Sequence, residues 1–161
     1  CNNFRSYIMM KKLILAMLMA AAALGASAGN PEKLFDEFKK VDNTEYVRVR
    51  RAFLWAFRAT GMLKDVPAVG NITGIKVLNF DSITPDTKNR FDRRLAEETE
   101  GWEEVLRTRD DDGSLVRMFS RTDGKKLHDL YILTSEPGET SFIRLGGTFS
   151  TDDLRKLAEK Q

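Results

Sequence analysis

The feature that most constrains this chain is an apolar segment near its start that ends in small residues. Lys11 and Lys12 precede an apolar run from Leu13 to Leu24, and Ala26-Ser27-Ala28 follows it. A short basic segment, an apolar core of this length and a small-x-small site are typical of a cleaved secretory signal peptide. The run is shorter than the roughly 20 residues that a membrane-spanning helix needs. We therefore expect cleavage after Ala28.

This leader sets the expected compartment and domain. Residues 1–8 precede the first plausible start, Met9 or Met10, and residues 9–28 form the expected signal peptide. An uncleaved membrane anchor is the alternative. After cleavage we expect a single periplasmic or secreted domain of residues 29–161, with no membrane span. The only cysteine is Cys1, so this domain has no disulfide and its core must stabilise it.

Removing the leader also changes the charge of the chain. The whole sequence has 26 Lys and Arg against 24 Asp and Glu. The leader holds three of the basic residues (Arg5, Lys11 and Lys12) and no acidic one, so 23 basic and 24 acidic side chains remain. A net charge of −1 removes the main electrostatic argument for nucleic-acid binding.

Periodicity and capping residues predict the first half of the fold. Asn30-Pro31-Glu32 is a helix start, and Leu34, Phe35 and Phe38 follow at helical spacing. Residues 44–50 and 72–80 are predicted strands. Residues 52–60 are predicted to form a central buried helix, since apolar residues cover most of its circumference. Thr84-Pro85 opens a polar helix to about Glu100, anchored by Phe91 and Leu95.

Three turn signals organise the second half. They are Asp112-Gly113, Asp123-Gly124 and Pro137-Gly138. They predict four consecutive antiparallel strands at 102–109, 115–121, 126–134 and 140–148, followed by a short helix capped by residues 150–153. The predicted fold is α+β: a mainly antiparallel sheet with a four-stranded C-terminal meander and helices packed largely on one face. The pattern leaves open where strands 44–50 and 72–80 join.

Two-residue loops would place most apolar strand residues on one sheet face. The expected pairs are Leu106 with Phe119, Phe119 with His128, Leu115 with Ile132, Ile132 with Ile143, and Leu130 with Leu145. A three-residue first loop would instead set Arg107 opposite Arg117, and like charges directly opposite destabilise a sheet. We therefore prefer the first register, although it puts Arg117 on the apolar face.

The order of these elements resembles a known family. The resembling features are the leader, the Glu32-Lys33-Leu34-Phe35 helix, Tyr46-Val47-Arg48-Val49, Trp102-Glu103-Glu104-Val105, the Asp-Gly hairpins, and Gly147 before Asp153-Leu154. In these the chain is similar to the exported domain-of-unknown-function proteins of Bacteroidetes-type bacteria (DUF4252-like) over most of residues 30–158. The resemblance implies an exported domain but no activity and no catalytic residues. Some members are encoded near extracytoplasmic sigma-factor genes, which implies a role in envelope sensing or regulation.

No motif for catalysis, a cofactor or a metal stands out, so we expect a non-enzymatic protein. His128 is the only histidine, which excludes a multi-histidine metal site. The expected pairing turns it to the apolar face, beside Phe119 and opposite Gly147, as a core or sheet-end residue. Asp129 would point to the other face, so the two form no simple dyad. A hydrolase that uses His128 as general base is the third hypothesis.

The best candidate surface is the other face of the meander. There we expect Arg107, Arg109, Tyr131 and Arg144, with Met118, Val116 and Phe142 among them. Arginine and aromatic side chains together are typical of interaction hot spots, and arginine pairs with anions. The first hypothesis is therefore a module that binds an envelope protein. The second is a carrier of a small apolar or anionic ligand. A further helix-covered face or a solvated sheet face is the alternative interpretation.

Overall fold

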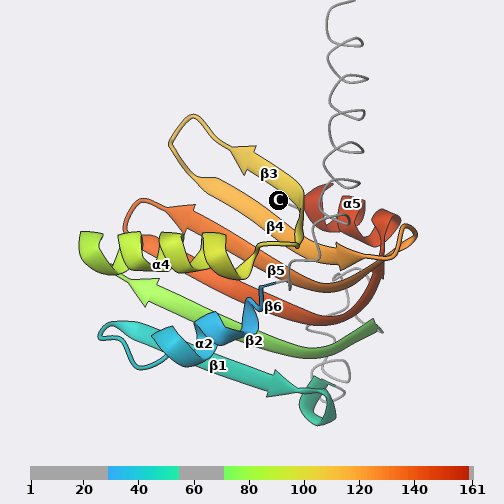
Figure 1. Ribbon diagram of the computed structural model, residues 1–161, viewed down its shortest axis with the longest axis horizontal. Helices are drawn as coiled ribbons and strands as arrows, with labels where there is room; N and C mark the ends of the chain where they lie inside the picture. The colour runs from blue at the N-terminus through green and yellow to red at the C-terminus, as the bar shows by residue number, and fades with distance from the viewer. Residues whose placement is uncertain (1–28, 55–70, 160–161) are drawn as a thin grey trace, which may run out of the picture.

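One antiparallel sheet organises the chain. The computed structural model describes residues 29–54 and 71–159 (Figure 1). The elements in order are α2 (Glu32–Phe38), β1 (Thr44–Arg50), β2 (Ile72–Asp81), α4 (Pro85–Glu98), β3 (Glu103–Arg109), β4 (Leu115–Thr122), β5 (Lys126–Glu136), β6 (Glu139–Ser150) and α5 (Thr151–Glu159). The six strands form a single sheet with the order β1-β2-β6-β5-β4-β3. The predicted α+β class with a mainly antiparallel sheet is confirmed.

The first two strands join the sheet at β6. Strands β3, β4, β5 and β6 pair in succession, each antiparallel to the next. β2 then pairs with the free side of β6, and β1 pairs with β2, so β1 and β3 form the two edges. This arrangement brings residues 44–50 beside residues 74–80 and places both next to the last strand.

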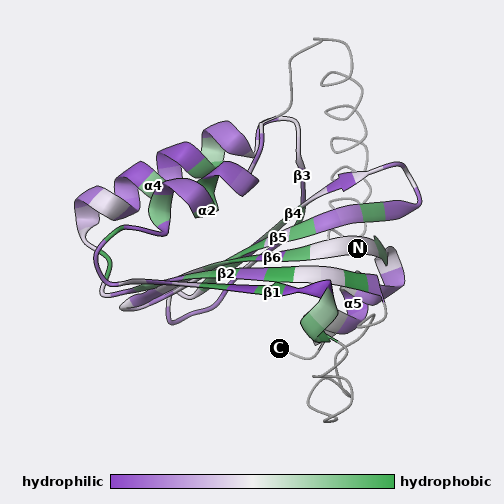
Figure 2. Cartoon of the chain, turned by 90° about the horizontal axis from the view of Figure 1, so that it is seen from below, coloured by the Kyte–Doolittle hydropathy of each residue, from purple (hydrophilic) through white to green (hydrophobic). Residues whose placement is uncertain are grey.

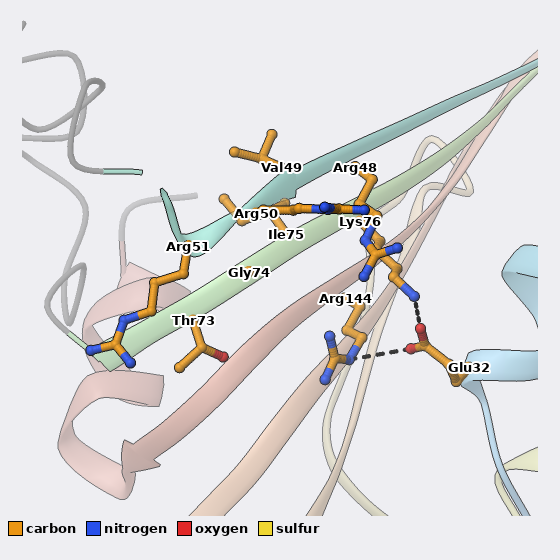
Figure 3. A pocket seen from close by; sticks show the side chains of 10 residues that line it. All are labelled: Glu32, Arg48, Val49, Arg50, Arg51, Thr73, Gly74, Ile75, Lys76 and Arg144. Atoms are coloured by element: carbon orange, nitrogen blue, oxygen red, sulfur yellow. Dashed lines mark ion pairs between the residues drawn. The ribbon is translucent and has the colours of Figure 1, made fainter. Parts of the chain in front are cut away.

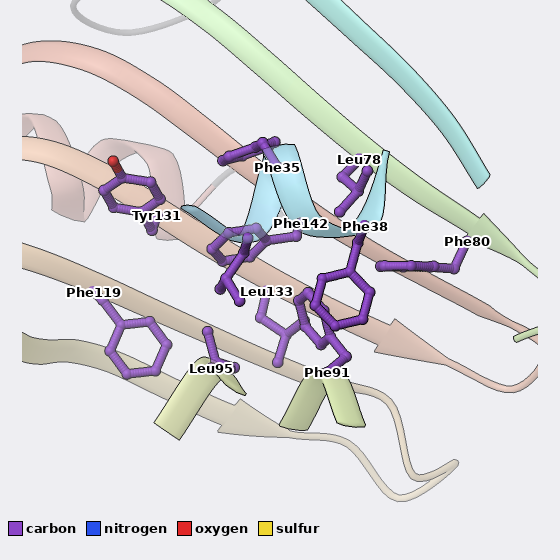
Figure 4. Packing of buried hydrophobic residues seen from close by; sticks show 11 residues of the cluster. Phe35, Phe38, Leu78, Phe80, Phe91, Leu95, Phe119, Tyr131, Leu133 and Phe142 are labelled. Carbon is purple, nitrogen blue, oxygen red and sulfur yellow. The ribbon is translucent and has the colours of Figure 1, made fainter. Parts of the chain in front are cut away.

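Helices α2 and α4 cover one face of the sheet (Figure 2). Between them and the strands lies the main core, drawn in Figure 4: Leu34, Phe35, Phe38, Leu78, Phe80, Phe91, Leu95, Phe119, Tyr131, Leu133 and Phe142. The ring centroid of Phe91 on α4 lies 5.1 Å from that of Phe38, 5.2 Å from Phe80 and 5.6 Å from Phe142. These edge-to-face contacts hold both helices against β2 and β6.

The other face carries a second, smaller core. Its buried members are Leu54, Ile72, Leu127, Leu130 and Phe149, and α5 lies on this side of the sheet (Figure 2). Residues 51–54 are helical, but Phe53 is 63% exposed there, so this turn is not buried all round as predicted. The rest of the predicted helix 52–60 and the predicted leader lie outside the described residues.

The predicted strand register holds between β5 and β6 and fails between β3, β4 and β5. Ile132 pairs with Ile143 and Leu130 with Leu145 as expected. However, Phe119 pairs with Tyr131 rather than His128, Leu115 with Ser135 rather than Ile132, and Leu106 with Met118 rather than Phe119. The physical reason is twofold: residues 110–114 form a longer loop than assumed, and bulges interrupt β3–β4 and β4–β5.

The shift changes which β4 side chains share a face with those of β5, so Phe119 lies beside Tyr131 and Met118 beside Ile132. The face that packs against α2 and α4 holds Phe119, Tyr131 and Phe142, whereas Ile132 and Ile143 belong to the opposite face. The expectation that the face of Ile132 and Ile143 packs against these helices is therefore wrong. The β5–β6 register is as predicted, so this second difference concerns which face the helices cover and not the strand register.

The rejected pairing of Arg107 with Arg117 is the real one. Glu104 makes it stable, because one of its carboxylate oxygens lies 2.9 Å from Nε of Arg107 and the other 2.8 Å from Nη2 of Arg117. The guanidinium of Arg117 also lies 4.8 Å from the centroid of the Phe119 ring. A carboxylate between two arginines removes the repulsion on which the rejection rested.

Candidate anion-binding cleft

Three cationic side chains lie in a row across three neighbouring strands. Arg48 of β1 pairs directly with Lys76 of β2, and Lys76 pairs with Arg144 of β6. Adjacent strands are about 4.8 Å apart, and directly opposed residues share a face. The row lies on the α2 side, since Tyr131, the next residue in it, belongs to the main core. Like charges in such a row repel one another, so their retention needs an explanation.

The row borders an open cleft of about 290 Å³. Arg48, Arg50, Arg51, Lys76 and Arg144 line it, and among the described residues Glu32 is the only carboxylate in the lining (Figure 3). Its floor is low because Gly74 and Gly146 are paired. A Cβ on Gly146 would come 3.1 Å from Nη1 of Arg144 and 3.0 Å from Oγ1 of Thr73. Glycine there lets the Arg144 guanidinium lie close to the strand.

Glu32, the first residue of α2, reaches into the cleft (Figure 3). Its carboxylate forms an ion pair with Lys76, accepts a 3.2 Å hydrogen bond from the Tyr131 hydroxyl, and lies 3.3 Å from Nε of Arg144. Asn30 positions the helix start, because its side-chain oxygen accepts a hydrogen bond from the Glu32 backbone N–H. One carboxylate thus faces three donors from three strands.

The hydrogen-bond donors around the Glu32 carboxylate are incompletely satisfied. Nε of Arg144 is buried and has no hydrogen-bond partner, since the Glu32 carboxylate is near it but not aligned. Burial of the Lys76 side chain, 14% exposed, lowers its pKa from the usual 10.5, and the neighbouring Arg144 cation lowers it further. Burial raises the pKa of the Tyr131 hydroxyl, which therefore stays a donor. The site favours another negative group.

A bulge in β5 holds Arg144 from the other side. Asp129 adopts a positive φ of 56° there, and its carboxylate accepts a 3.0 Å hydrogen bond from the Gly147 N–H. The same oxygen lies 3.4 Å from Nη2 of Arg144. The Arg144 guanidinium therefore lies between the carboxylates of Glu32 and Asp129.

A second open cleft of about 440 Å³ adjoins the first and shares Glu32 and Arg144 with it. Its remaining lining includes Tyr131, Trp102 and Arg121. The Arg121 guanidinium lies 4.6 Å from the centroid of the Trp102 ring, a cation–π contact. Aromatic and cationic groups thus continue along the sheet beyond the anion-facing row.

Comparison with known proteins identifies a family. The family model for a domain of unknown function, DUF4252, matches residues 35–157. The chain belongs to this family. Neither a curated protein nor a solved structure matches the chain. The match includes Arg48, Lys76 and Arg144, whereas Glu32 lies before its first residue.

The four predicted site residues of this DUF4252 domain lie in two separate places. Tyr131 and Arg144 are directly paired and both line the second cleft. Arg107 and Arg109 lie on the far edge strand, β3, three strands from β6. Met118 and Val116, predicted to accompany them, lie on the opposite face because of the register shift. The predicted face is also not an open one, since α2 and α4 cover much of it.

The functional residues that sequence reasoning missed are Glu32, Arg48 and Lys76. Alternation in residues 44–50 and 72–80 assigns each side chain to one of two faces, but the shared row depends on β2 pairing with β6. Nothing in the local pattern gives that long-range pairing. The available signal was Lys76, the only charged residue in the predicted strand 72–80.

His128 does not face the apolar side, so that expectation is wrong. It is exposed and pairs with Arg121 and Thr148. Its Nε2 lies 3.0 Å from the Asp123 carboxylate, and its Nδ1 lies 3.5 Å from the Thr148 hydroxyl. The His128 hydrogen bond, followed by two backbone N–H groups, lowers the pKa of Asp123 to about 2. Asp129, in its bulge, contacts Arg144 instead.

The described residues offer neither a metal site nor a membrane-spanning helix. No group of three His, Cys, Asp or Glu side chains in residues 29–54 and 71–159 is arranged to hold a metal ion. None of the helices in the same ranges is both long and apolar enough to cross a bilayer. The cationic cleft is therefore the feature that the proposed function uses.

Proposed function

We propose that this DUF4252 domain is a non-catalytic binding module of the cell envelope whose ligand presents an anionic group to the cleft beside α2. The supporting observation is the row Arg48, Lys76 and Arg144, three cations directly opposite one another on neighbouring strands. The Glu32 carboxylate lies between Lys76 and Arg144, so the repulsion that remains in the row is that between Arg48 and Lys76. Local features that oppose folding are expected where they serve a function.

The environment of the row strengthens its attraction for an anion. The side chains of Lys76 and Arg144 are 14% and 25% exposed, so water screens their charges less than at an open surface. Arg144 lies between Glu32 and Asp129, and its Nε has no hydrogen-bond partner. A guanidinium can bind a carboxylate or phosphate through two parallel hydrogen bonds.

The envelope location rests on the leader pattern of residues 9–28, and a role in sensing or regulation rests on the family resemblance alone. The ligand is either a free small molecule, which the module would carry, or an anionic group displayed by an envelope protein. Both use the same cationic chemistry. A hydrolase centred on His128 stays a separate hypothesis, because His128 lines the second cleft and contacts Asp123 and Thr148, neither of which lines the first.

Calorimetric titration with sulfate at low ionic strength tests this proposal. We expect saturable binding of one sulfate, reduced at least ten-fold in Arg144→Gln. Arg144→Lys keeps the charge beside Glu32 and serves where the glutamine variant fails to fold; it should weaken binding less, since it loses only the paired hydrogen bonds.

Arg109→Gln is the matched control, since it removes one exposed arginine from the far edge of the same sheet. Its affinity for sulfate should equal that of the unmodified protein. Absence of saturable binding, or an equal loss in Arg109→Gln and Arg144→Gln, would overturn the proposal, because the attraction would then be general rather than local.

A further inference from the structure

The cationic cleft has two parts that differ in how their charges are balanced. In the inner part, Lys76 and Arg144 face the Glu32 carboxylate, and Arg144 also contacts Asp129. In the outer part, no carboxylate of the described residues lies within ion-pair distance of Arg48, Arg50 or Arg51. Asp36 interacts electrostatically with Arg48, but its carboxylate forms an ion pair with Lys39 at 2.8 Å.

The inner part shows how this protein holds an anion. The Glu32 carboxylate meets an ammonium, a guanidinium and a phenol hydroxyl, from three different strands. The fit is incomplete, because Nε of Arg144 remains without a hydrogen bond. A tetrahedral anion with more acceptor oxygens would satisfy this donor in place of the Glu32 carboxylate, whose side chain is 30% exposed.

The outer part repeats the cationic chemistry one strand away. Arg48 pairs with Lys76, so its side chain leaves the sheet about 4.8 Å from that of Lys76 on the same face. Arg50 follows two residues later and pairs with Gly74, which has no side chain to fill the space above it. Two places that can each hold an anionic group therefore lie next to each other across β1, β2 and β6.

We infer that the ligand of this cleft carries at least two neighbouring anionic groups, one taking the place of the Glu32 carboxylate over Lys76 and Arg144 and the next lying over Arg48 and Arg50. This inference rests on the proposed function and names its ligand class. A single anion would neutralise one part and leave the other uncompensated. The cleft of about 290 Å³ is at the small end for a ligand site, which fits a compact oligoanion.

Comparing phosphate with pyrophosphate, and acetate with citrate, at one pH and ionic strength tests this inference. We expect pyrophosphate to bind at least ten-fold more tightly than phosphate if the groups are phosphoryl. Citrate should gain similarly over acetate if they are carboxylates. Arg48→Gln should remove most of the gain of the oligoanion while changing phosphate or acetate affinity by less than three-fold.

Two further variants test where on the sheet the anions bind. Glu32→Gln should tighten binding of the single anion several-fold, because the internal competitor loses its charge. Arg109→Gln removes an exposed arginine from the opposite edge strand. It should leave unchanged the affinity of pyrophosphate relative to phosphate and of citrate relative to acetate.

The outcomes separate this inference from the proposed function. If phosphate and pyrophosphate bind alike, and acetate and citrate bind alike, the site takes a single anion and the oligoanion inference fails while the proposed function survives. The inference also fails if the gain persists unchanged in Arg48→Gln or disappears equally in Arg109→Gln. If none of the four probes binds, the proposed function itself fails.

Discussion

The indole Nε1 of Trp102 donates a 2.7 Å hydrogen bond to the carbonyl oxygen of Gly29, 73 positions earlier in the chain. The Gly29 N–H in turn donates to the carbonyl oxygen of Glu100 at 2.8 Å. A Cβ on Gly29 would lie 2.5 Å from the backbone of Glu98, so only glycine fits this approach. These contacts fasten the segment before α2, and with it Glu32, to the end of α4.

Trp102→Phe should lower the free energy of unfolding by about 1–2 kcal/mol, since it leaves the Gly29 carbonyl without its donor. The phenyl ring can keep the edge-to-face contact with Tyr131, now 5.1 Å between centroids. Chemical denaturation measures the change. Unchanged stability would show that solvent replaces the indole and that the contact does not fasten the segment.

Glu98→Gln should lower the free energy of unfolding by about 1–3 kcal/mol. The buried Glu98 carboxylate accepts a 2.8 Å hydrogen bond from the Asn30 N–H and pairs with Arg94 at 2.8 Å. The Asn30 N–H, and then Arg94, hold the pKa of Glu98 below its usual 4.5 despite burial. Because the folded-state pKa is the lower one, this stabilisation is complete above about pH 4.5 and disappears as the pH falls through the folded value.

Glu97→Gln is the matched control for that experiment. Glu97 also pairs with Arg94 but its side chain is 52% exposed, so its loss should cost less than about 1 kcal/mol. Denaturation at pH 7 and pH 3 gives the comparison. Equal losses in the two variants, or a Glu98→Gln deficit that is as large at pH 3 as at pH 7, would contradict the role given to the buried carboxylate.

Gly147→Ala should destabilise the protein by about 3 kcal/mol or more. The φ of Gly147 is +141°, and a Cβ would lie 2.1 Å from the carbonyl oxygen of Asn71, so strain and overpacking add. Gly113→Ala is the control: its φ is +89°, but a Cβ there meets nothing within 4 Å, so only a conformational cost of about 1 kcal/mol applies. Thermal unfolding of the two variants measures the difference.

The local elements of this fold follow from neighbouring residues, and its long-range pairings do not. Thr84 caps α4 as predicted, because its hydroxyl accepts from the Thr87 N–H close by in the chain. The register of β3 against β4 depended on a charge argument that omitted Glu104, which only the folded sheet places between Arg107 and Arg117. The rule that opposed like charges destabilise a sheet failed here, because the carboxylate of a third residue compensates both arginines.

The candidate site shows the same limit. Tyr131 and Arg144 were predicted because β5 and β6 form a hairpin whose register can be counted from Pro137-Gly138. Lys76 and Arg48 join them only through the pairing of β2 with β6, and Glu32 only through the packing of α2 over that row. No residue within these segments encodes the order β1-β2-β6, which arises from burying one shared aromatic core.

Sulfate binding should become weaker as the pH rises toward 10.5, because Lys76 loses its charge. Burial and Arg144 lower the pKa of Lys76 in the free protein, and a bound anion favours the ammonium form, so binding takes up protons where the free side chain is partly neutral. Burial raises the pKa of the Tyr131 hydroxyl, the other group of the site whose pKa moves, so its loss of a proton shifts to higher pH. Calorimetry in buffers of different ionisation enthalpy measures the uptake. Lys76→Gln should bind more weakly and without this pH dependence, and an identical alkaline decline in that variant would assign the titration to another group.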